Sequence, residues 1–440
     1  MRIRFHPRVP PLVSTAALVL CIAMLPGCGG GGPGPGPGPG PGGGGGGTDP
    51  WSLDGEFAEI EAEAPGFGGY FFAGDGTLTV YVQDPATQGP AARDAVARRT
   101  AGRGRSSRMP AGAAEIRVQR GTYAFSQLQA WRTRLAPILL ARADVVYLDV
   151  AEDGNALRIG VLSDTEASVQ ARVAAEGVPG GAFAIVAAEA PRRLQHTLRE
   201  NAWERGPGGG VPGGYLVHWN ADGRTGYCAL GFNVHLLPIR DPASYTGGYV
   251  TASHCSDVQG TRDRAQHYQP ENPHHLGSEV RDPAFVTGGE CPAGRRCRWS
   301  DAAVFTHSPG RLLDIGLVAR VGGVGSSEVA GSPLRIQGKR PFPVAGEIVD
   351  KVGPGSGLTF GRVYATCADV NVADSDIVLF CQDVMDHPAS TGESGSPVYV
   401  PRTADAVDLA GLLWGGTAEV GWFSSVRGME RELGDLEVGG

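Results

Sequence analysis

The hydrophobic pattern between residues 115 and 187 switches between the spacing of helices and that of strands. Apolar residues three and four positions apart predict helices over 126–141 and 164–176. Shorter apolar runs predict four strands, at 115–119, 145–150, 157–162 and 182–187. An Asp-Gly-Asn turn at 153–155 joins the second strand to the third as a hairpin. Together these elements predict a small α+β unit.

Two further patterns precede this unit. Residues 65–83 read as a pair of strands around a Gly-Asp-Gly turn at 74–76. Residues 93–108 hold six arginines and few apolar residues. That composition is typical of a solvated, flexible loop, and a processing site is the alternative interpretation.

The pattern changes after residues 206–214, which hold six Gly and two Pro and are typical of a boundary between domains. Beyond this boundary, short β-prone runs alternate with Gly, Pro, Asn and Asp clusters, at 215–219, 229–234, 302–306 and 410–414. Helical spacing returns mainly at 426–433. We therefore expect an all-β sandwich or barrel over 206–440, preceded by an α+β domain over 50–205.

The first 28 residues have the pattern of a secretory signal peptide. Arg2, Arg4 and Arg8 precede an apolar stretch over 12–25 that is too short for a permanent membrane-spanning helix. The stretch ends in Leu-Pro-Gly-Cys at 25–28, which resembles the lipobox of bacterial lipoproteins. This resemblance implies a lipid on Cys28, and the alternative is an ordinary signal peptide with an incidental cysteine.

The signal is followed by a tether. Residues 29–47 consist of 14 Gly and 5 Pro, a composition that makes a flexible spacer. We expect a signal at 1–28 and a tether at 29–49, so that a lipid anchors the chain to the membrane of the bacterial cell envelope, at the outer membrane or cell surface. Cleavage near the 206–214 boundary would then release the second domain to the extracellular space.

Composition excludes several classes of protein. With 41% hydrophobic and 19% charged residues, the 440-residue chain is not wholly disordered. No apolar run reaches the roughly 20 residues of a membrane-spanning helix. The net charge of -8 argues against nucleic acid as a partner, because phosphate binding favours a basic surface.

The cysteine count agrees with export. Cys21 lies in the signal and Cys28 at the lipid site, and six cysteines remain, Cys228, Cys255, Cys291, Cys297, Cys367 and Cys381. Six cysteines can pair in 15 ways, and sequential pairing is the simplest. No CxxC pair or His spacing suggests zinc, and we read His274 and His275 as part of an exposed loop. We therefore expect neither a metal nor a cofactor.

Three short motifs carry candidate chemistry. A histidine stands at position 254 just after a strand-like run, an aspartate at 301 heads an apolar run, and a serine at 394 lies in the segment Gly-Glu-Ser-Gly-Ser-Pro. Each motif alone has a structural interpretation: a histidine beside a cysteine, a turn aspartate, and a Gly-Ser turn. Their combination and order carry more information than any one of them.

Taken together, the motifs over 215–435 resemble the chymotrypsin-like serine peptidases, in the chain order His, Asp, Ser. The resemblance implies a double β-barrel with a short C-terminal helix, acting on proteins or peptides as a monomer. It implies that His254 is the general base, that Asp301 orients and stabilises the imidazole, and that Ser394 is the nucleophile. The backbone amides of Gly392 and Ser394 would form the oxyanion hole.

The resemblance also implies further contacts and pairings. The strand ending in Trp414, Gly415 and Gly416 would line the substrate pocket and pair with the substrate backbone. Disulfides would join Cys228 to Cys255 and Cys367 to Cys381. The loop from Cys291 to Cys297 would then lie just ahead of Asp301.

The chain departs from this family at several positions. Glu393 replaces the usual aspartate before the nucleophile, Ser396 replaces a glycine, and Leu413 replaces a serine that supports the catalytic aspartate. No Arg-Ile-Val-Gly-Gly activation sequence lies near residue 206, so a pro-region fits better than activation by a freed N-terminus. At the base of the pocket, Pro388 and Asp386 do not indicate a preference for Arg or Lys.

Two functions therefore follow from the sequence. The first is a secreted or envelope-anchored serine endopeptidase that works through an acyl-enzyme, with residues 50–205 as a pro-region or regulatory domain. The alternative is a catalytically inactive peptidase-fold lipoprotein that acts as a binding protein, which the three departures at the site would explain.

Overall fold

The computed structural model describes residues 52–193 and 211–439, apart from positions 102, 104, 105, 113 and 114 and the segments 222–223, 236–246, 270–273 and 309–314. The predicted signal, Cys28 and the tether lie outside the described residues, as does the boundary segment up to residue 210. The described residues belong to one compact unit. In the part of the chain that is described, no helix is long and apolar enough to cross a membrane.

The N-terminal part is an α+β arrangement. Its elements are α1 (Leu53–Glu63), β1 (Phe67–Phe72), β2 (Leu78–Val82), α2 (Pro85–Thr100), β3 (Arg117–Arg120), α3 (Phe125–Leu139), β4 (Val145–Ala151), β5 (Ala156–Val161), α4 (Glu166–Ala175), the 3-10 turn η1 (Gly180–Ala182), β6 (Phe183–Ala187) and β7 (Arg192–Arg193). Strands β1, β2 and β3 form one sheet, and β4 and β5 pair as the expected antiparallel hairpin. Phe57, Leu128 and Leu135 belong to the apolar core beneath these elements.

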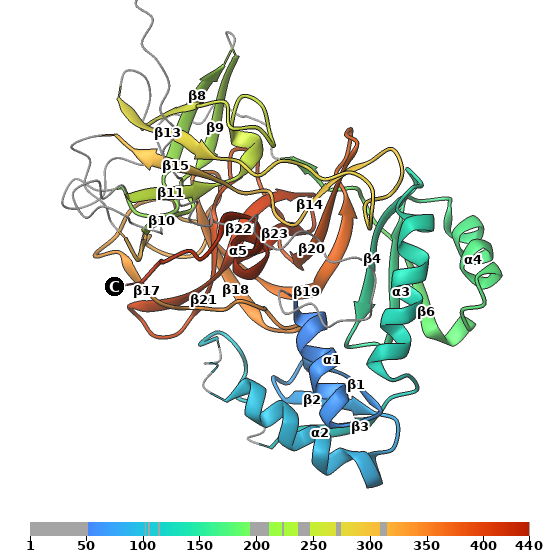
Figure 1. Ribbon diagram of the computed structural model, residues 1–440. Coiled ribbons are helices and arrows are strands. Elements are labelled where there is room, and N and C mark those ends of the chain that lie inside the picture. The colour runs from blue at the N-terminus through green and yellow to red at the C-terminus, as the bar shows by residue number, and fades with distance from the viewer. Residues whose placement is uncertain are drawn as a thin grey trace, which may run out of the picture. The chain divides into compact units, whose positions relative to one another are not determined.

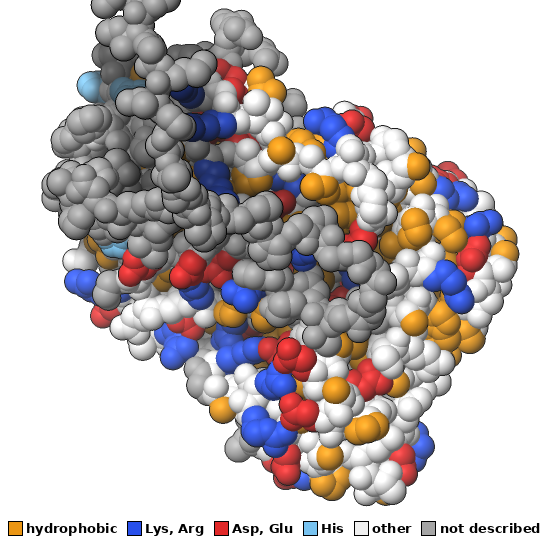
Figure 2. All heavy atoms as spheres, viewed as in Figure 1, with side chains coloured by type: hydrophobic (Ala, Val, Ile, Leu, Met, Phe, Trp, Pro, Cys, Tyr) orange, Lys and Arg blue, Asp and Glu red, His pale blue; other side chains and the backbone are white. Residues whose placement is uncertain are grey.

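The prediction of a solvated loop over 93–108 is wrong for its first half. Residues up to Thr100 belong to α2, which starts at Pro85 after the capping side chain of Asp84. Arg98 and Arg99 bind acidic side chains of α1, and Arg103 binds Glu56. Figure 2 shows basic and acidic side chains intermixed over the region of α1 and α2. The arginines therefore serve as partners for a helix that the sequence analysis did not predict.

The C-terminal part forms a double β-barrel, the fold class expected from the sequence (Figure 1). The first sheet has the order β10-β11-β15-β13-β12-β8-β9. Its strands are β8 (Leu216–Ala221), β9 (Arg224–Ala229), β10 (Phe232–His235), β11 (Gly247–Thr251), β12 (Gln266–Tyr268), β13 (His275–Arg281) and β15 (Ala303–His307), with the 3-10 turn η4 (Ser253–Cys255) after β11. All neighbours in this sheet are antiparallel.

The second barrel closes on itself. Its strands β19, β20, β23, β22, β21 and β18 pair in a ring, because β20 returns to pair with β19. The elements of this half are β14 (Arg296–Arg298), β16 (Leu317–Val318), β17 (Leu334–Lys339), β18 (Ile348–Gly353), β19 (Gly357–Asn371), β20 (Ile377–Met385), β21 (Pro397–Pro401), β22 (Ala406–Gly416), β23 (Gly421–Ser425) and helix α5 (Val426–Leu433). Helix α5 spans the predicted residues and is capped by Ser425, whose hydroxyl accepts from the amide of Gly428.

The α+β part extends the sheet of the second barrel. Strand β4 pairs antiparallel with β19, so that β6, β5 and β4 continue the barrel sheet beyond its ring (Figure 1). Val378 and Phe380 of β20 belong to the apolar core of the α+β part. The long hairpin of β19 and β20 is therefore shared between the two parts of the chain.

Candidate active site

The fold brings His254, Asp301 and Ser394 together. His254 lies in the turn η4 that follows β11, and Asp301 lies just before β15, which pairs with β11. His254 Nδ1 is 2.7 Å from Asp301 Oδ2, and His254 Nε2 is 2.8 Å from Ser394 Oγ. Asp301 and Ser394 are fully buried. These are the contacts through which a serine hydroxyl is activated as a nucleophile.

The turn that carries Ser394 depends on glycine. Gly392 and Gly395 have φ angles of 83° and 92°, a region that favours glycine. A Cβ on Gly395 would lie 2.3 Å from both Ala229 O and Thr251 Oγ1, so the turn packs directly against the first barrel. Within the described residues, the amide of Gly392 donates to no acceptor. The turn thus holds at least one donor ready for a substrate oxyanion.

Glu393 forms a fully buried ion pair with Lys351 of β18. Its Oε1 also accepts hydrogen bonds from the amide of Ser356 at 2.8 Å and its hydroxyl at 2.6 Å, and its Oε2 accepts from the amide of Ser390 at 2.8 Å. Burial works against ionisation of Glu393, but the Lys351 ammonium and these hydrogen bonds outweigh it and lower the pKa of the carboxyl. The longer side chain therefore has a complete set of partners.

Lys351 was missed by the sequence analysis. The chain has only two lysines, Lys339 and Lys351, and the second interrupts the apolar strand at 348–352. A lysine inside an apolar strand is the signal that would have indicated it, because lysine is almost never fully buried without a partner. The partner itself lies 42 residues away in the chain.

The carboxylate of Asp301 has partners other than His254 Nδ1. Its Oδ1 accepts from the amide of His254 at 3.1 Å and from Nε2 of Gln259 at 3.0 Å. The amide of Asp301 donates to Ser424 Oγ at 3.0 Å. Leu413, at the position expected to support this aspartate, instead packs in an apolar cluster of the second barrel. The sequence analysis did not identify Gln259 or Ser424.

A buried ion pair lies behind the triad. Arg298 and Asp282 have fully buried side chains 2.8 Å apart. Arg298 also donates to Ser253 Oγ at 2.9 Å and to the carbonyl of Ala302 at 2.8 Å. The residues next to His254 and next to Asp301 are thus tied to one charged group.

The six cysteines form three disulfides, Cys228–Cys255, Cys291–Cys297 and Cys367–Cys381, which is the sequential pairing. The first ties β9 to the turn that carries His254. The second closes a loop ahead of Asp301, and the third links β19 to β20. All three are compatible with an exported protein.

The expected substrate strand has a neighbour within the chain. Gly415 and Gly416 of β22 pair antiparallel with Arg193 and Arg192 of β7. The Trp414 side chain is fully buried and donates to Gln382, so it offers no surface to a substrate. Its carbonyl oxygen lies 3.5 Å from Ser394 Oγ. Strand β7 of the same chain thus lies along the edge of β22 beside the nucleophile.

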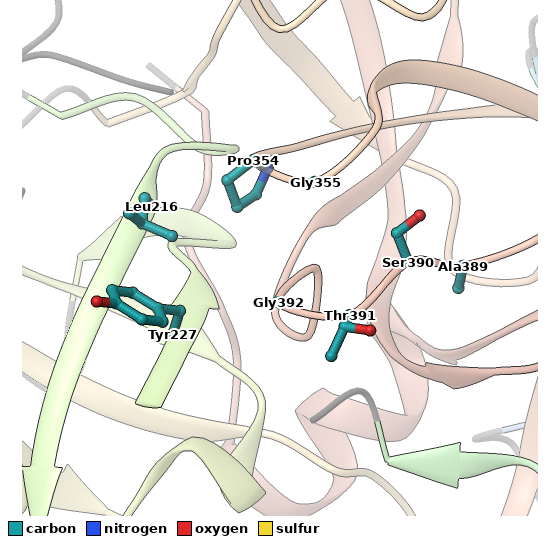
Figure 3. Close-up of a pocket in the computed structure, with 8 residues that line it drawn as sticks. All are labelled: Leu216, Tyr227, Pro354, Gly355, Ala389, Ser390, Thr391 and Gly392. Atoms are coloured by element: carbon teal, nitrogen blue, oxygen red, sulfur yellow. The ribbon is translucent and has the colours of Figure 1, made fainter. Parts of the chain in front are cut away.

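A cavity of about 260 Å³ adjoins the nucleophile turn. Figure 3 shows Leu216 and Tyr227 of the first barrel on one side of it and the backbone of Ser390, Thr391 and Gly392 on the other. Asp386 is exposed, and its carboxylate accepts from the amide of Arg362, so it places no charge in this cavity.

The described residues contain no group of three His, Cys, Asp or Glu side chains arranged to hold a metal ion. His274 is exposed, but His275 is not part of an exposed loop as expected: it is half-buried on β13, and its Nδ1 is 2.5 Å from Ser308 Oγ.

No family model matches the chain, and no curated protein matches it. Three solved structures each match 52% of this chain. Nocardiopsis protease is 19% identical, is covered over 98% of its own length and has a TM-score of 0.37. Thermobifida fusca protease A is 18% identical, is covered over 100% and has a TM-score of 0.36. Cellulomonas bogoriensis chymotrypsin is 20% identical, is covered over 97% and has a TM-score of 0.35.

Proposed function

We propose that residues 211–439 are an active serine endopeptidase. The observation that carries the proposal is the aligned chain of contacts from Asp301 through His254 to Ser394, with a glycine turn at the nucleophile. The complete hydrogen bonding of Glu393 supports activity over the inactive alternative, because that departure leaves no buried charge unpaired.

The reaction follows from this geometry. Ser394 Oγ attacks the scissile carbonyl carbon while His254 Nε2 takes the hydroxyl proton. The oxyanion that forms accepts hydrogen bonds from the amides of Gly392 and Ser394. His254 then gives the proton to the leaving amine as the carbon–nitrogen bond breaks, which leaves an acyl ester on Ser394. A water molecule, deprotonated by His254, hydrolyses that ester.

A fluorophosphonate probe tests this proposal, because it reacts only with an activated serine. The full chain and its processed products should be labelled, and Ser394→Ala should abolish the label. Ser396→Ala, two residues along the same turn, is the matched control and should keep it. A wild-type protein that stays unlabelled in every processed form would reject an active peptidase and favour a binding protein.

We also propose that residues 50–205 act as an inhibitory pro-region. Strand β7 is paired with Gly415 and Gly416, the backbone that a substrate would need. The pairing of β4 with β19 holds the same region against the barrel. While β7 stays in place, a substrate strand has no edge on which to pair.

Proline at β7 tests the inhibition, since proline removes an amide donor and disfavours strand pairing. In the uncleaved chain, Arg193→Pro should speed labelling of Ser394 several-fold. Glu189→Pro, in the segment between β6 and β7, is the control and should label at the wild-type rate. Equal rates for all three proteins would show that β7 does not block the site.

A further inference from the structure

Asp301 needs more partners than the histidine provides. Its side chain is 1% exposed, and an ionised carboxylate in such a place must have its lone pairs satisfied by donors. Two of the donors described above belong to His254 itself, through Nδ1 and the backbone amide. The side chain of Gln259 supplies a third from a separate segment, at 3.0 Å.

The orientation of the Gln259 amide follows from its chemistry. A carboxylate only accepts hydrogen bonds, so the side chain must present Nε2 rather than Oε1 to Asp301. The Oε1 atom is buried and has no hydrogen-bond partner among the described residues. The side chain thus gives up a hydrogen bond at one end while it keeps the bond to the triad at the other.

The turn that carries Gln259 is anchored from two sides. The amide of Val258 donates to the carboxylate of Asp263, and the amide of Gly260 donates to Asp282 Oδ2 at 2.6 Å. Gly260 has a φ of 80°, and a Cβ there would lie 2.5 Å from the ring of Phe285. The backbone on both sides of Gln259 is therefore held in a conformation that the sequence can adopt only with glycine at 260.

The same buried ion pair positions both members of this contact. Asp282 holds the amide of Gly260 next to Gln259, and its partner Arg298 holds the carbonyl of Ala302 next to Asp301. The distance from Gln259 to Asp301 is thus set by a fully buried pair and not by a free surface side chain. Such support is what a positioning residue requires.

We propose that Gln259 is a positioning residue of the triad, which fixes the Asp301 carboxylate against His254 by a hydrogen bond from its side-chain amide. The proposal rests on the peptidase function proposed above. It goes beyond that function because it names the side chain that supports Asp301. Leu413 has no hydroxyl with which to support it, and Gln259 supplies a donor instead.

Gln259→Leu tests the proposal, because it keeps the approximate size and removes the donor. A hydrogen bond to a charged group typically stabilises by 1.5 to 3 kcal/mol, so kcat should fall about 10- to 100-fold with KM little changed. The acidic limb of the kcat/KM profile should move to higher pH, because a carboxylate that has lost a donor stabilises the imidazolium more. Val258→Ala, at a neighbouring residue 55% exposed, is the matched control and should change neither quantity.

An NMR titration of the His254 imidazole in the full chain separates this proposal from the peptidase function. In Gln259→Leu the titration curve should move to higher pH, whether or not the protein hydrolyses peptides. If Gln259→Leu does not fold, Gln259→Asn, whose amide is one methylene short of Asp301, should give the same shift. A wild-type curve in a folded variant would overturn the role of Gln259, while an inactive wild type would overturn only the peptidase function.

Discussion

Two regions of the molecule bury charged groups in opposite ways. Beside the nucleophile, Glu393 is paired with Lys351, and four hydrogen-bonding contacts satisfy its two oxygens. Three carboxyl groups are buried where the α+β part meets the β19–β20 hairpin, those of Asp149, Glu152 and Asp383. Neighbouring positive charges and hydrogen bonds balance their charges much less well than that of Glu393. In the first region the buried carboxylate is neutralised by an ion pair, and in the second region the buried carboxyls are not.

The contacts at the second region are few. Both carboxylate oxygens of Asp149 lack a hydrogen-bond partner among the described residues, and Arg158 Nη1 is 3.7 Å from one of them. Glu152 accepts from Thr366 Oγ1 at 2.9 Å, and Asp383 accepts from the amide of Cys367 at 3.0 Å. The other charged groups facing the cluster are Asp54, Arg132, Asp153 and Asp369. Arg132 is already engaged, with Asp54 at 2.8 Å and Asp369 at 3.1 Å.

These surroundings shift the pKa values upward. Burial raises the pKa of Asp383 to about 8, with the nearby charges of Asp149 and Asp54 adding to it. Burial also raises the pKa of Asp149, although Arg158 and Arg132 oppose it, and burial and the charge of Asp149 raise that of Glu152. The Glu393 carboxylate beside the nucleophile therefore stays ionised near neutral pH, whereas the contact between the two parts of the chain favours protonated carboxyls.

The largest effect on stability and activity is expected from breaking the ion pair of Lys351 and Glu393. Lys351→Met leaves Glu393 buried without its counter-ion, which typically costs 3 to 5 kcal/mol of stability. Because Glu393 holds the turn that carries the oxyanion donors, kcat should also fall by about 100- to 1,000-fold. Urea unfolding and the rate of peptide hydrolysis measure the two effects.

The other lysine of the chain provides the control for this variant. Lys339 is 27% exposed and binds Glu430 and Asp435, so Lys339→Met should cost only about 1 kcal/mol and leave kcat unchanged. If Lys351→Met were no worse than Lys339→Met, the buried pair would not hold the nucleophile turn.

A smaller effect is expected from pH. A carboxyl whose pKa is raised by folding contributes stability that is fully present below its unfolded pKa and is lost as pH rises through its folded pKa. For Asp383 this loss begins near pH 4 and continues to about pH 8. The unfolding temperature should therefore fall between pH 5 and pH 8.

The Glu393 carboxylate has a contribution of the opposite sign, in another pH range. The pKa of Glu393 is lowered, so its contribution is present above its ordinary pKa near 4.5 and is lost only as pH falls below that value. Stability that rose steadily from pH 5 to pH 8 would contradict this assignment of the two regions.

The smallest effect is expected from neutralising one member of the cluster. Asp383→Asn removes a carboxyl whose pKa is raised by folding, so it should raise the unfolding temperature, and by more at pH 8 than at pH 5. Asp75→Asn is the control, because that side chain is 52% exposed, is paired with Arg117 and is not among the charges that face the cluster, so it should not change the slope between pH 5 and pH 8. A destabilised Asp383→Asn at pH 8 would mean that its carboxylate is ionised and needed.

Local pattern was enough to predict many elements. Helix α3 lies within one or two residues of its predicted limits, the hairpin of β4 and β5 has the predicted turn, and α5 spans the predicted residues. Helices α1 and α2 were both missed, because the contacts that hold them join segments far apart in the sequence. Arg98 and Arg99 of α2 bind Glu59 and Glu63 of α1, 35 to 40 positions away in the sequence.

The sequence by itself determined the order of His254, Asp301 and Ser394, the even set of cysteines and the glycines of the nucleophile turn, because each of these is a matter of residue type at a position. Only the tertiary structure decided which group neutralises Glu393, which amide supports Asp301, and that β7 lies along Gly415 and Gly416. These contacts join segments that are distant in the sequence. Which group pairs with a buried charge or a strand edge depends on which segments the fold packs together. The residue type shows that a buried group requires a partner, and the tertiary structure determines which residue that partner is.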